Sequence, residues 1–174
     1  MPEVTASVLY GLSDLLMGAG RDWPLVVEDR PGESALRVQI VSADGQPLTV
    51  ANGVPVVPHA ALADVPAPQV ICIPEVFVLP SADLRGRFEA EVAWLRQAHA
   101  GGAVIATACS GALLMAEAGL LDGEDATTHW AYCDALAQRH PRIRLHRQRA
   151  LVTAGEGQRL VMAGGGTSWQ DLGL

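Results

Sequence analysis

The stretch that decides the fold is Ala103–Ala118, which reads AVIATACSGALLMAEA. It opens with Ala103–Thr107, a short run rich in β-branched residues, of the kind found in a strand buried on both faces. From Ser110 to Ala118 all residues except Glu117 are small or apolar, which is typical of a buried helix, and Gly119 can end that helix. The stretch therefore predicts a strand, a tight turn at Cys109 and a helix.

On both sides of this unit, short apolar runs alternate with longer segments whose apolar residues have helical spacing. This alternation predicts an α/β domain in three layers with a mainly parallel central sheet. A small hairpin is expected between Leu48–Val50 and Val54–Val57, turning at Asn52-Gly53. Further strands are predicted over Val4–Tyr10, Leu36–Val41, Gln69–Ile73, Ile143–Leu145, Leu151–Thr153 and Leu160–Met162. Three further helices are expected. The first follows a turn at Gly11–Asp14, and the last spans Ala131–Arg139. The middle one is capped by Ser81 and ends at Gly101-Gly102, with Leu84, Phe88, Val92 and Leu95 on one face.

Composition narrows the class of protein further. The 174 residues suffice for one domain, 1–174, and 49% hydrophobic residues with a mean hydropathy of +0.22 exclude a disordered chain. A net charge of −7 makes nucleic acid an unfavourable partner for this stretch. Three cysteines, no recognisable signal peptide and no apolar run long enough for a bilayer predict a cytoplasmic protein with no membrane contact. No histidine has a companion at ligand spacing, so neither a metal nor a cofactor is expected.

Cys109 is the sharpest candidate for chemistry. A thiol between a buried strand and a helix, with small neighbours, has the layout of a nucleophile elbow, which predicts a positive φ at this residue. The helix N-terminus would lower its pKa and make it the most reactive of the three thiols. The alternative is an inert buried cysteine. His129, twenty residues on, is the natural basic partner, although a histidine beside a tryptophan is also commonly a packing residue.

Two carboxylates are expected near the same edge of the sheet. Asp14 can cap the first helix, or it can face Cys109, because both turns would lie at the carboxyl ends of parallel strands. Glu75 follows Pro74 at another strand end. Two acids beside one thiol can hold it protonated as readily as activate it.

The segments Ala106–Ala112, Leu114–Gly123 and Ala126–Trp130 resemble the core signature of the class I glutamine-amidotransferase-like superfamily. Leu-Asp-Gly followed by Ala-Thr-Thr-His-Trp is the specific part, and the resemblance covers nearly the whole chain. Within the superfamily, the chain resembles above all the PfpI-like sensor domains at the N-terminus of AraC-type transcriptional regulators. This resemblance implies a flavodoxin-like fold.

The same resemblance implies the site. Cys109 matches the elbow cysteine of the superfamily, His129 its histidine and Asp14 its early acidic position, while Glu75, Ser110 and Thr128 would line the pocket. It implies a domain that senses a small molecule and forms a homodimer in a transcriptional regulator. The alternatives are a stand-alone thiol enzyme acting on a small carbonyl or isocyanide (a glyoxalase, deglycase, hydratase or hydrolase) and a purely structural dimerisation module.

Two features depart from that pattern. Glu75 stands where the family usually has glycine, and a carboxylate there opposes negative charge developing in a reaction. No helix-turn-helix pattern precedes Leu174, so DNA would be bound only through a further C-terminal module.

The run Gly164–Ser168 is typical of the entry to a helix, but only six residues follow it. This favours a longer parent protein or a last helix that has been trimmed.

Overall fold

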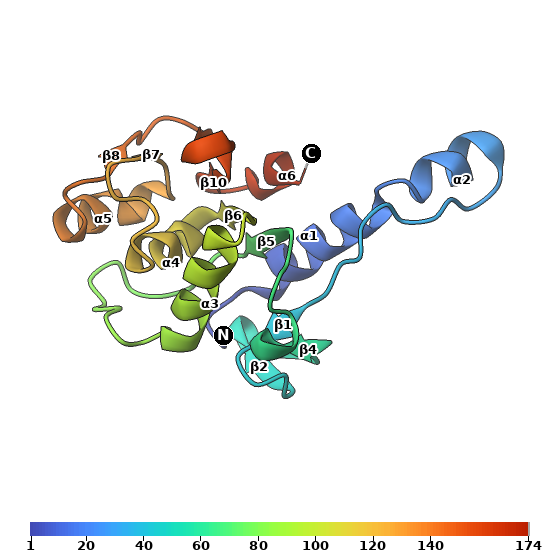
Figure 1. Ribbon diagram of the computed structural model, residues 1–174, viewed down its shortest axis with the longest axis horizontal. Helices are drawn as coiled ribbons and strands as arrows, with labels where there is room; N and C mark the ends of the chain where they lie inside the picture. Colours follow the sequence, from blue (N-terminus) through green and yellow to red (C-terminus); the bar gives the residue numbers. More distant parts are fainter. Residues whose placement is uncertain (174) are drawn as a thin grey trace.

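The computed structural model describes residues 1–173, and its centre is a four-stranded sheet (Figure 1). The strand order is β5-β6-β10-β9, in which β5, β6 and β10 are parallel and β9 is antiparallel to β10. These strands span Val70–Ile73 (β5), Val104–Ala108 (β6), Leu151–Ala154 (β9) and Leu160–Ala163 (β10). Their positions agree with the predicted strands to within two residues.

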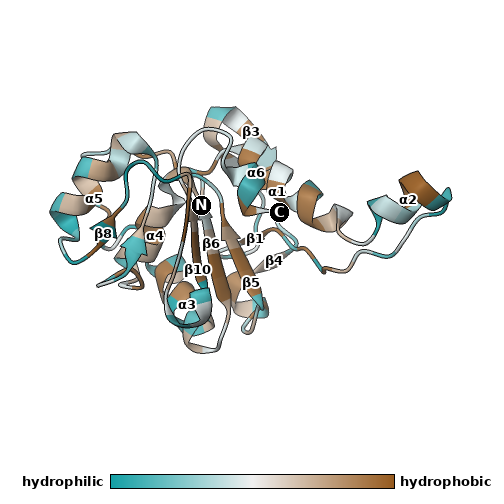
Figure 2. Cartoon of the chain, turned by 90° about the horizontal axis from the view of Figure 1, so that it is seen from above, coloured by the Kyte–Doolittle hydropathy of each residue, from teal (hydrophilic) through white to brown (hydrophobic). Residues whose placement is uncertain are grey.

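Helices cover both faces of this sheet, which confirms the predicted three-layer arrangement. On one face Leu95, Leu114 and Leu136 from three helices pack with the strands in the main core. On the other face Leu12 and Trp169 pack around Ala108. Figure 2 shows the strands between the two helical layers in apolar colours. The helices are α3 (Glu89–Ala100), α4 (Ala112–Glu117) and α5 (Cys133–Arg139) on the first face, and α1 (Ala6–Gly18) and α6 (Trp169–Leu172) on the second.

Three small two-stranded sheets lie around the centre. The expected hairpin forms, with Asn52 and Gly53 both at positive φ in its turn, as their sequence favours. Of the expected strand Leu36–Val41, only its last residue is in a strand. The pairs are β2 (Leu48–Val50) with β3 (Val54–Val56), β1 (Val41–Ser42) with β4 (Ala60–Ala61), and β7 (Asp125–Ala126) with β8 (Arg144–Leu145).

The predicted strand Val4–Tyr10 and the turn after it are wrong. Residues 6–10 of that stretch belong to α1, which runs without a break through Gly11–Asp14, and Val4 forms only an isolated bridge with Val76. Val8 and Leu12 are both buried, four residues apart on one face of the helix, and this spacing outweighs the β-branched residues that suggested a strand.

The helix predicted to follow a Ser81 cap begins at Glu89, and its cap position is Phe88, seven residues later than predicted. Leu84 and Phe88 are buried as expected, but they enter the core from the irregular segment that precedes the helix. The C-terminal end agrees with the prediction, because Gly102 has a φ of +100° just after the last turn.

A projecting arm follows α1. It consists of residues 19–36 and carries the short helix α2 (Asp22–Glu28), which lies away from the rest of the molecule (Figure 1). Trp23 and Val26 on this helix are 73% and 80% exposed. Among residues 1–173, no helix is long and apolar enough to cross a bilayer.

Candidate functional site

Cys109 lies at the carboxyl end of β6, where the chain turns through residues 109–111 into α4. Its φ is +55°, a conformation that residues other than glycine rarely adopt, so the predicted positive φ is observed. The side chain is partly exposed. The strand–turn–helix geometry thus presents the thiol at the carboxyl edge of the parallel strands.

Two neighbours hold this turn against the end of β5. Ser110 Oγ donates to the Val76 carbonyl oxygen at 2.7 Å and accepts from the Val76 N–H at 3.0 Å. A Cβ added at Gly111 would lie 2.7 Å from the Pro74 carbonyl oxygen, so only glycine allows the two backbones to approach this closely. Ser110 therefore holds the backbone of the corner, although we expected it to line a pocket.

Glu75 is the carboxylate beside the thiol. It lies two residues after the end of β5 and is half-buried, and its Oε1 accepts a hydrogen bond of 2.6 Å from Thr5 Oγ1 at the start of α1. Thr5 was not predicted as a site residue, because its contact with Glu75 joins positions 70 residues apart.

The pKa of Cys109 is raised to about 11. Burial is the main cause, and the charge of Glu75 and its hydrogen bonding with the thiol raise the pKa further. Hydrogen bonds from Ser110 act in the opposite direction but are outweighed. The backbone N–H of Ser110 at the start of the helical turn does lower the pKa, but the expectation that this effect would prevail over burial and the carboxylate is wrong.

The pKa values of the other two thiols are raised as well. Burial raises the pKa of Cys72 to about 11 and also raises that of Cys133. The pKa values therefore give Cys109 no advantage over Cys72, and only its position in the turn distinguishes it.

Two residues from the segment after β7 complete the corner. Thr128 Oγ1 donates to the Cys109 carbonyl oxygen at 2.9 Å, so it holds the turn from the other side. Tyr132 donates its hydroxyl to the Val78 carbonyl oxygen at 2.7 Å. Burial raises the pKa of Tyr132, and the charges of Cys109 and Glu75 add to the effect, so the phenol lies within electrostatic range of both groups. The sequence offers one signal for this residue, because Tyr132 follows the candidate histidine by three positions.

His129 belongs to the same segment but makes no hydrogen bond to Cys109 in the part of the chain described. Its Nδ1 accepts from the Ala131 N–H at 3.2 Å, and its ring lies 5.2 Å from that of Trp130. A side chain at Gly165 would collide with the His129 ring. In this arrangement His129 is a packing and capping residue.

Asp14 is exposed on α1, and its charge acts on the Arg21 guanidinium, where it contributes to raising that pKa. It contributes nothing to the raised pKa of Cys109. The expected pairing with Cys109 depended on a strand and turn that the chain does not form, and Glu75 occupies that place.

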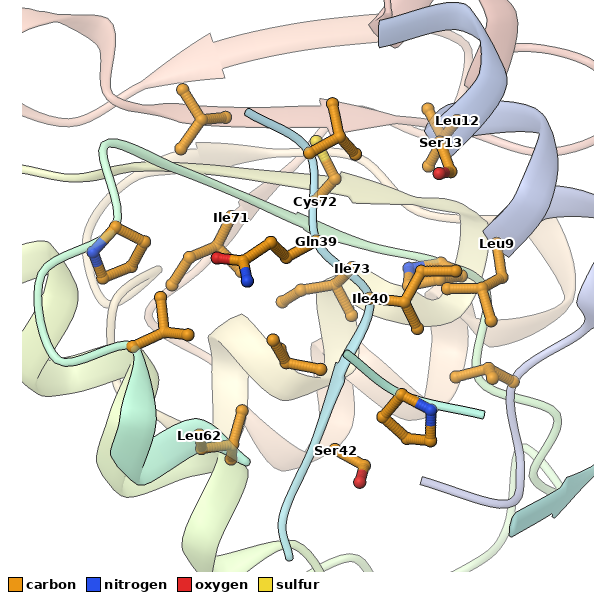
Figure 3. A pocket seen from close by; sticks show the side chains of 18 of the residues that line it. Leu9, Leu12, Ser13, Gln39, Ile40, Ser42, Leu62, Ile71, Cys72 and Ile73 are labelled. Carbon is orange, nitrogen blue, oxygen red and sulfur yellow. The ribbon is translucent and has the colours of Figure 1, made fainter. Parts of the chain in front are cut away.

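A cavity of about 620 Å³ lies on the far side of β5 from β6 (Figure 3). Ile71, Cys72 and Ile73 line one side of it, and Gln39 and Ile40 line another. Neither Cys109 nor Glu75 lines this cavity, although Pro74, the residue before Glu75, does.

Comparison with known proteins identifies the family. Residues 26–163, which include the elbow and the segment of His129, match the model of the DJ-1/PfpI family. The chain belongs to this family. A solved structure, an AraC family transcriptional regulator from Pseudomonas putida, has the same fold, with a TM-score of 0.74 at 16% identity over 99% of this chain and 84% of that one. The expected flavodoxin-like α/β fold is thus confirmed.

Two curated relatives differ in what they do. The HTH-type transcriptional regulator CdhR of Pseudomonas aeruginosa is 32% identical over 145 residues, which are 83% of this chain and 41% of the regulator. The isonitrile hydratase of Pseudomonas putida is 34% identical over 103 residues, which are 58% of this chain and 43% of the hydratase. The chain spans less than half the length of either relative.

Replacement of Gly111 by alanine is expected to destabilise the domain. The new Cβ must displace the backbone of Pro74 and Ile73, so the free energy of unfolding should fall by about 1–3 kcal/mol. Urea denaturation measures it. Gly101→Ala is the control, since Gly101 is exposed with a φ of −78°, and it should change stability by less than about 1 kcal/mol. Equal losses in both variants would contradict the close approach.

Replacement of Glu75 by glutamine is expected to make Cys109 more reactive. The amide keeps an oxygen for Thr5 but removes the negative charge that raises the thiol pKa, so the thiolate fraction at pH 8 increases. Iodoacetamide labelling followed by mass spectrometry should show a rate several-fold higher at Cys109 and unchanged rates at Cys72 and Cys133. Glu89→Gln, an exposed site, is the control. An unchanged or slower rate at Cys109 would mean that Glu75 does not act on the thiol.

Proposed function

We propose that the chain is the ligand-sensing and dimerisation domain of an HTH-type, AraC-type transcriptional regulator, with a small molecule bound near Cys109. The observation that carries this proposal is the 32% identity to the regulator CdhR, which extends over 83% of the chain. DNA would be contacted by a separate module, in keeping with the net charge of −7 of this domain. We also propose a cytoplasmic location, where such a regulator reaches DNA.

The chemistry of the corner supports binding more than turnover. A thiol with a pKa of about 11 is almost fully protonated at neutral pH, so it is a weak nucleophile and a hydrogen-bond donor. Glu75 beside it is an acceptor, and Tyr132 offers a hydroxyl. Such a set of fixed polar groups beside buried apolar residues suits recognition of a small polar molecule.

The alternative is a thiol enzyme, and the identity to the isonitrile hydratase favours it. Cys109 would then be the nucleophile and Glu75 would exchange protons with it or with the substrate. His129 would need to leave its bond to the Ala131 N–H before it could act as a base. The elbow geometry suits this chemistry, but the raised thiol pKa opposes it.

Ligand screening and an isonitrile assay distinguish the two functions. If the domain is a sensor, the screen is expected to find at least one small amine, carboxylate or carbonyl compound that raises Tm by several degrees. A ligand at a hundred times its Kd stabilises the folded protein by about 2.7 kcal/mol. Glu75→Ala should abolish that shift. Incubation with an alkyl isocyanide should give no formamide above the level of Cys109→Ser. Formamide production that Cys109→Ser abolishes would contradict the sensor proposal and support the enzyme.

We further propose that the projecting arm holds two copies together. Trp23 and Val26 lie exposed on α2, where a second copy could cover them. Light scattering at micromolar concentration is expected to give about twice 18.3 kDa. Val26→Asp should reduce this mass to that of a monomer, whereas Leu79→Asp, which is 73% exposed away from the arm, should not. A wild-type monomer, or a dimer unaffected by Val26→Asp, would contradict this role for the arm.

A further inference from the structure

The hydroxyl donors of the Cys109 corner are already used within the protein. Four hydroxyl groups surround the turn, and each donates its proton to a carboxylate or carbonyl oxygen of the chain at 2.6 to 2.9 Å. They belong to Thr5, Ser110, Thr128 and Tyr132. A hydroxyl that has donated its only proton can still accept a hydrogen bond. Apart from the weak thiol donor, this corner therefore offers acceptors to a ligand.

The corner also carries one negative charge without a cation beside it. Glu75 Oε1 accepts from the neutral Thr5 hydroxyl, and none of the ion pairs in residues 1–173 includes Glu75. The charges that act on the pKa values of Cys109 and Tyr132 are those of Glu75 and of the thiol, and no arginine is among them. A half-buried carboxylate without a counterion favours a cationic ligand.

An exposed apolar face continues from this carboxylate along the segment 75–79. Val76 and Val78 are buried there, and the residues that follow each of them turn outward. Tyr132 donates to the Val78 carbonyl oxygen, so the helical turn Trp130–Tyr132 lies against the same segment. The three large side chains exposed on these two segments form what we call the outer rim: Phe77 (72%), Leu79 (73%) and Trp130 (76%). Such exposed apolar groups often mark a binding surface.

We propose that the ligand of the Cys109 corner is an amphiphilic primary amine, whose ammonium group binds Glu75 and whose aromatic or branched aliphatic body lies on the outer rim. This inference rests on the proposed sensing function and names the chemical class of its ligand. An ammonium group has a positive charge and three N–H donors, which match the carboxylate and the acceptors of the corner. The outer rim removes the apolar body from water, and the Trp130 ring also attracts a cation.

The same arrangement disfavours other classes of ligand. A carboxylate ligand would meet the like charge of Glu75. A neutral carbonyl compound needs a donor, and the hydroxyl protons of the corner are already bound. A small hydrophilic amine would leave the outer rim uncovered and gain nothing from its apolar surface. Tight binding therefore requires both the charged head and the apolar body.

Four small compounds test the two parts of the ligand separately on the unmodified chain. They are 3-phenylpropylamine, methylamine, 3-phenylpropan-1-ol and 3-phenylpropanoate, which have both parts, the charged head alone, a neutral head and an anionic head. NMR titration at neutral pH is expected to give a Kd of about 1 mM or lower for 3-phenylpropylamine, as its size allows. The other three compounds should bind at least tenfold more weakly.

Two substitutions separate the charge from the apolar contact. Glu75→Gln keeps an oxygen for Thr5 but removes the charge, so it should raise the Kd of 3-phenylpropylamine at least tenfold. Trp130→Ala should raise this Kd about threefold or more. Trp23→Ala is the matched control, because it removes a similarly exposed tryptophan from the arm and should leave the Kd unchanged. The compound series decides the matter if a corner variant does not fold.

Three results would overturn the proposal: binding of the alcohol as tight as that of the amine, equal effects of Trp130→Ala and Trp23→Ala, or a monomer mass for Leu79→Asp in light scattering, which would assign the outer rim to a second copy. Absence of binding by all four compounds would also overturn this ligand class. The sensing function would then stand only if a compound of another class gave the Glu75-dependent rise in Tm.

Discussion

The two hydrogen bonds between Ser110 Oγ and the backbone of Val76 are the contact on which the candidate site depends. A positive φ at a residue other than glycine costs on the order of 1–3 kcal/mol, so the conformation of Cys109 persists only where neighbouring contacts impose it. Ser110 fixes the turn to the end of β5, and Gly111 allows the backbones to meet. The same contact brings Glu75, the residue before Val76, next to the thiol.

That proximity determines which chemistry the corner favours. An elbow turn is suited to nucleophilic catalysis, but a partly buried thiol beside a carboxylate keeps its proton. Burial, assisted by Glu75, thus keeps the thiol protonated in a reactive geometry, which agrees with the proposed sensing function. This chain is similar both to a regulator and to an isonitrile hydratase, so local charges at the corner, rather than the fold, decide which function fits it better.

Local patterns were enough to predict the centre of the fold. The strands β5, β6 and β10 and the turn at Cys109 were predictable because continuous apolar runs and small residues allow few other structures. The N-terminal helix was missed because the apolar residues of Val4–Tyr10 fit either a strand or a helix until the burial of Val8 and Leu12 on one face is known. Glu75 was noted but Asp14 was preferred, and Thr5 and Tyr132 were missed, because their contacts join distant parts of the chain.

The titration of Cys109 tests the account most directly. In a variant with Cys72 and Cys133 replaced by serine, thiolate ultraviolet absorbance can be followed against pH, and the signal of the same variant with Cys109→Ser can be subtracted to remove the tyrosines. Burial and Glu75 predict a midpoint near 11. A midpoint below the ordinary value of 9.0 would contradict the account, since the corner would then hold an activated nucleophile and the enzyme would become the better interpretation.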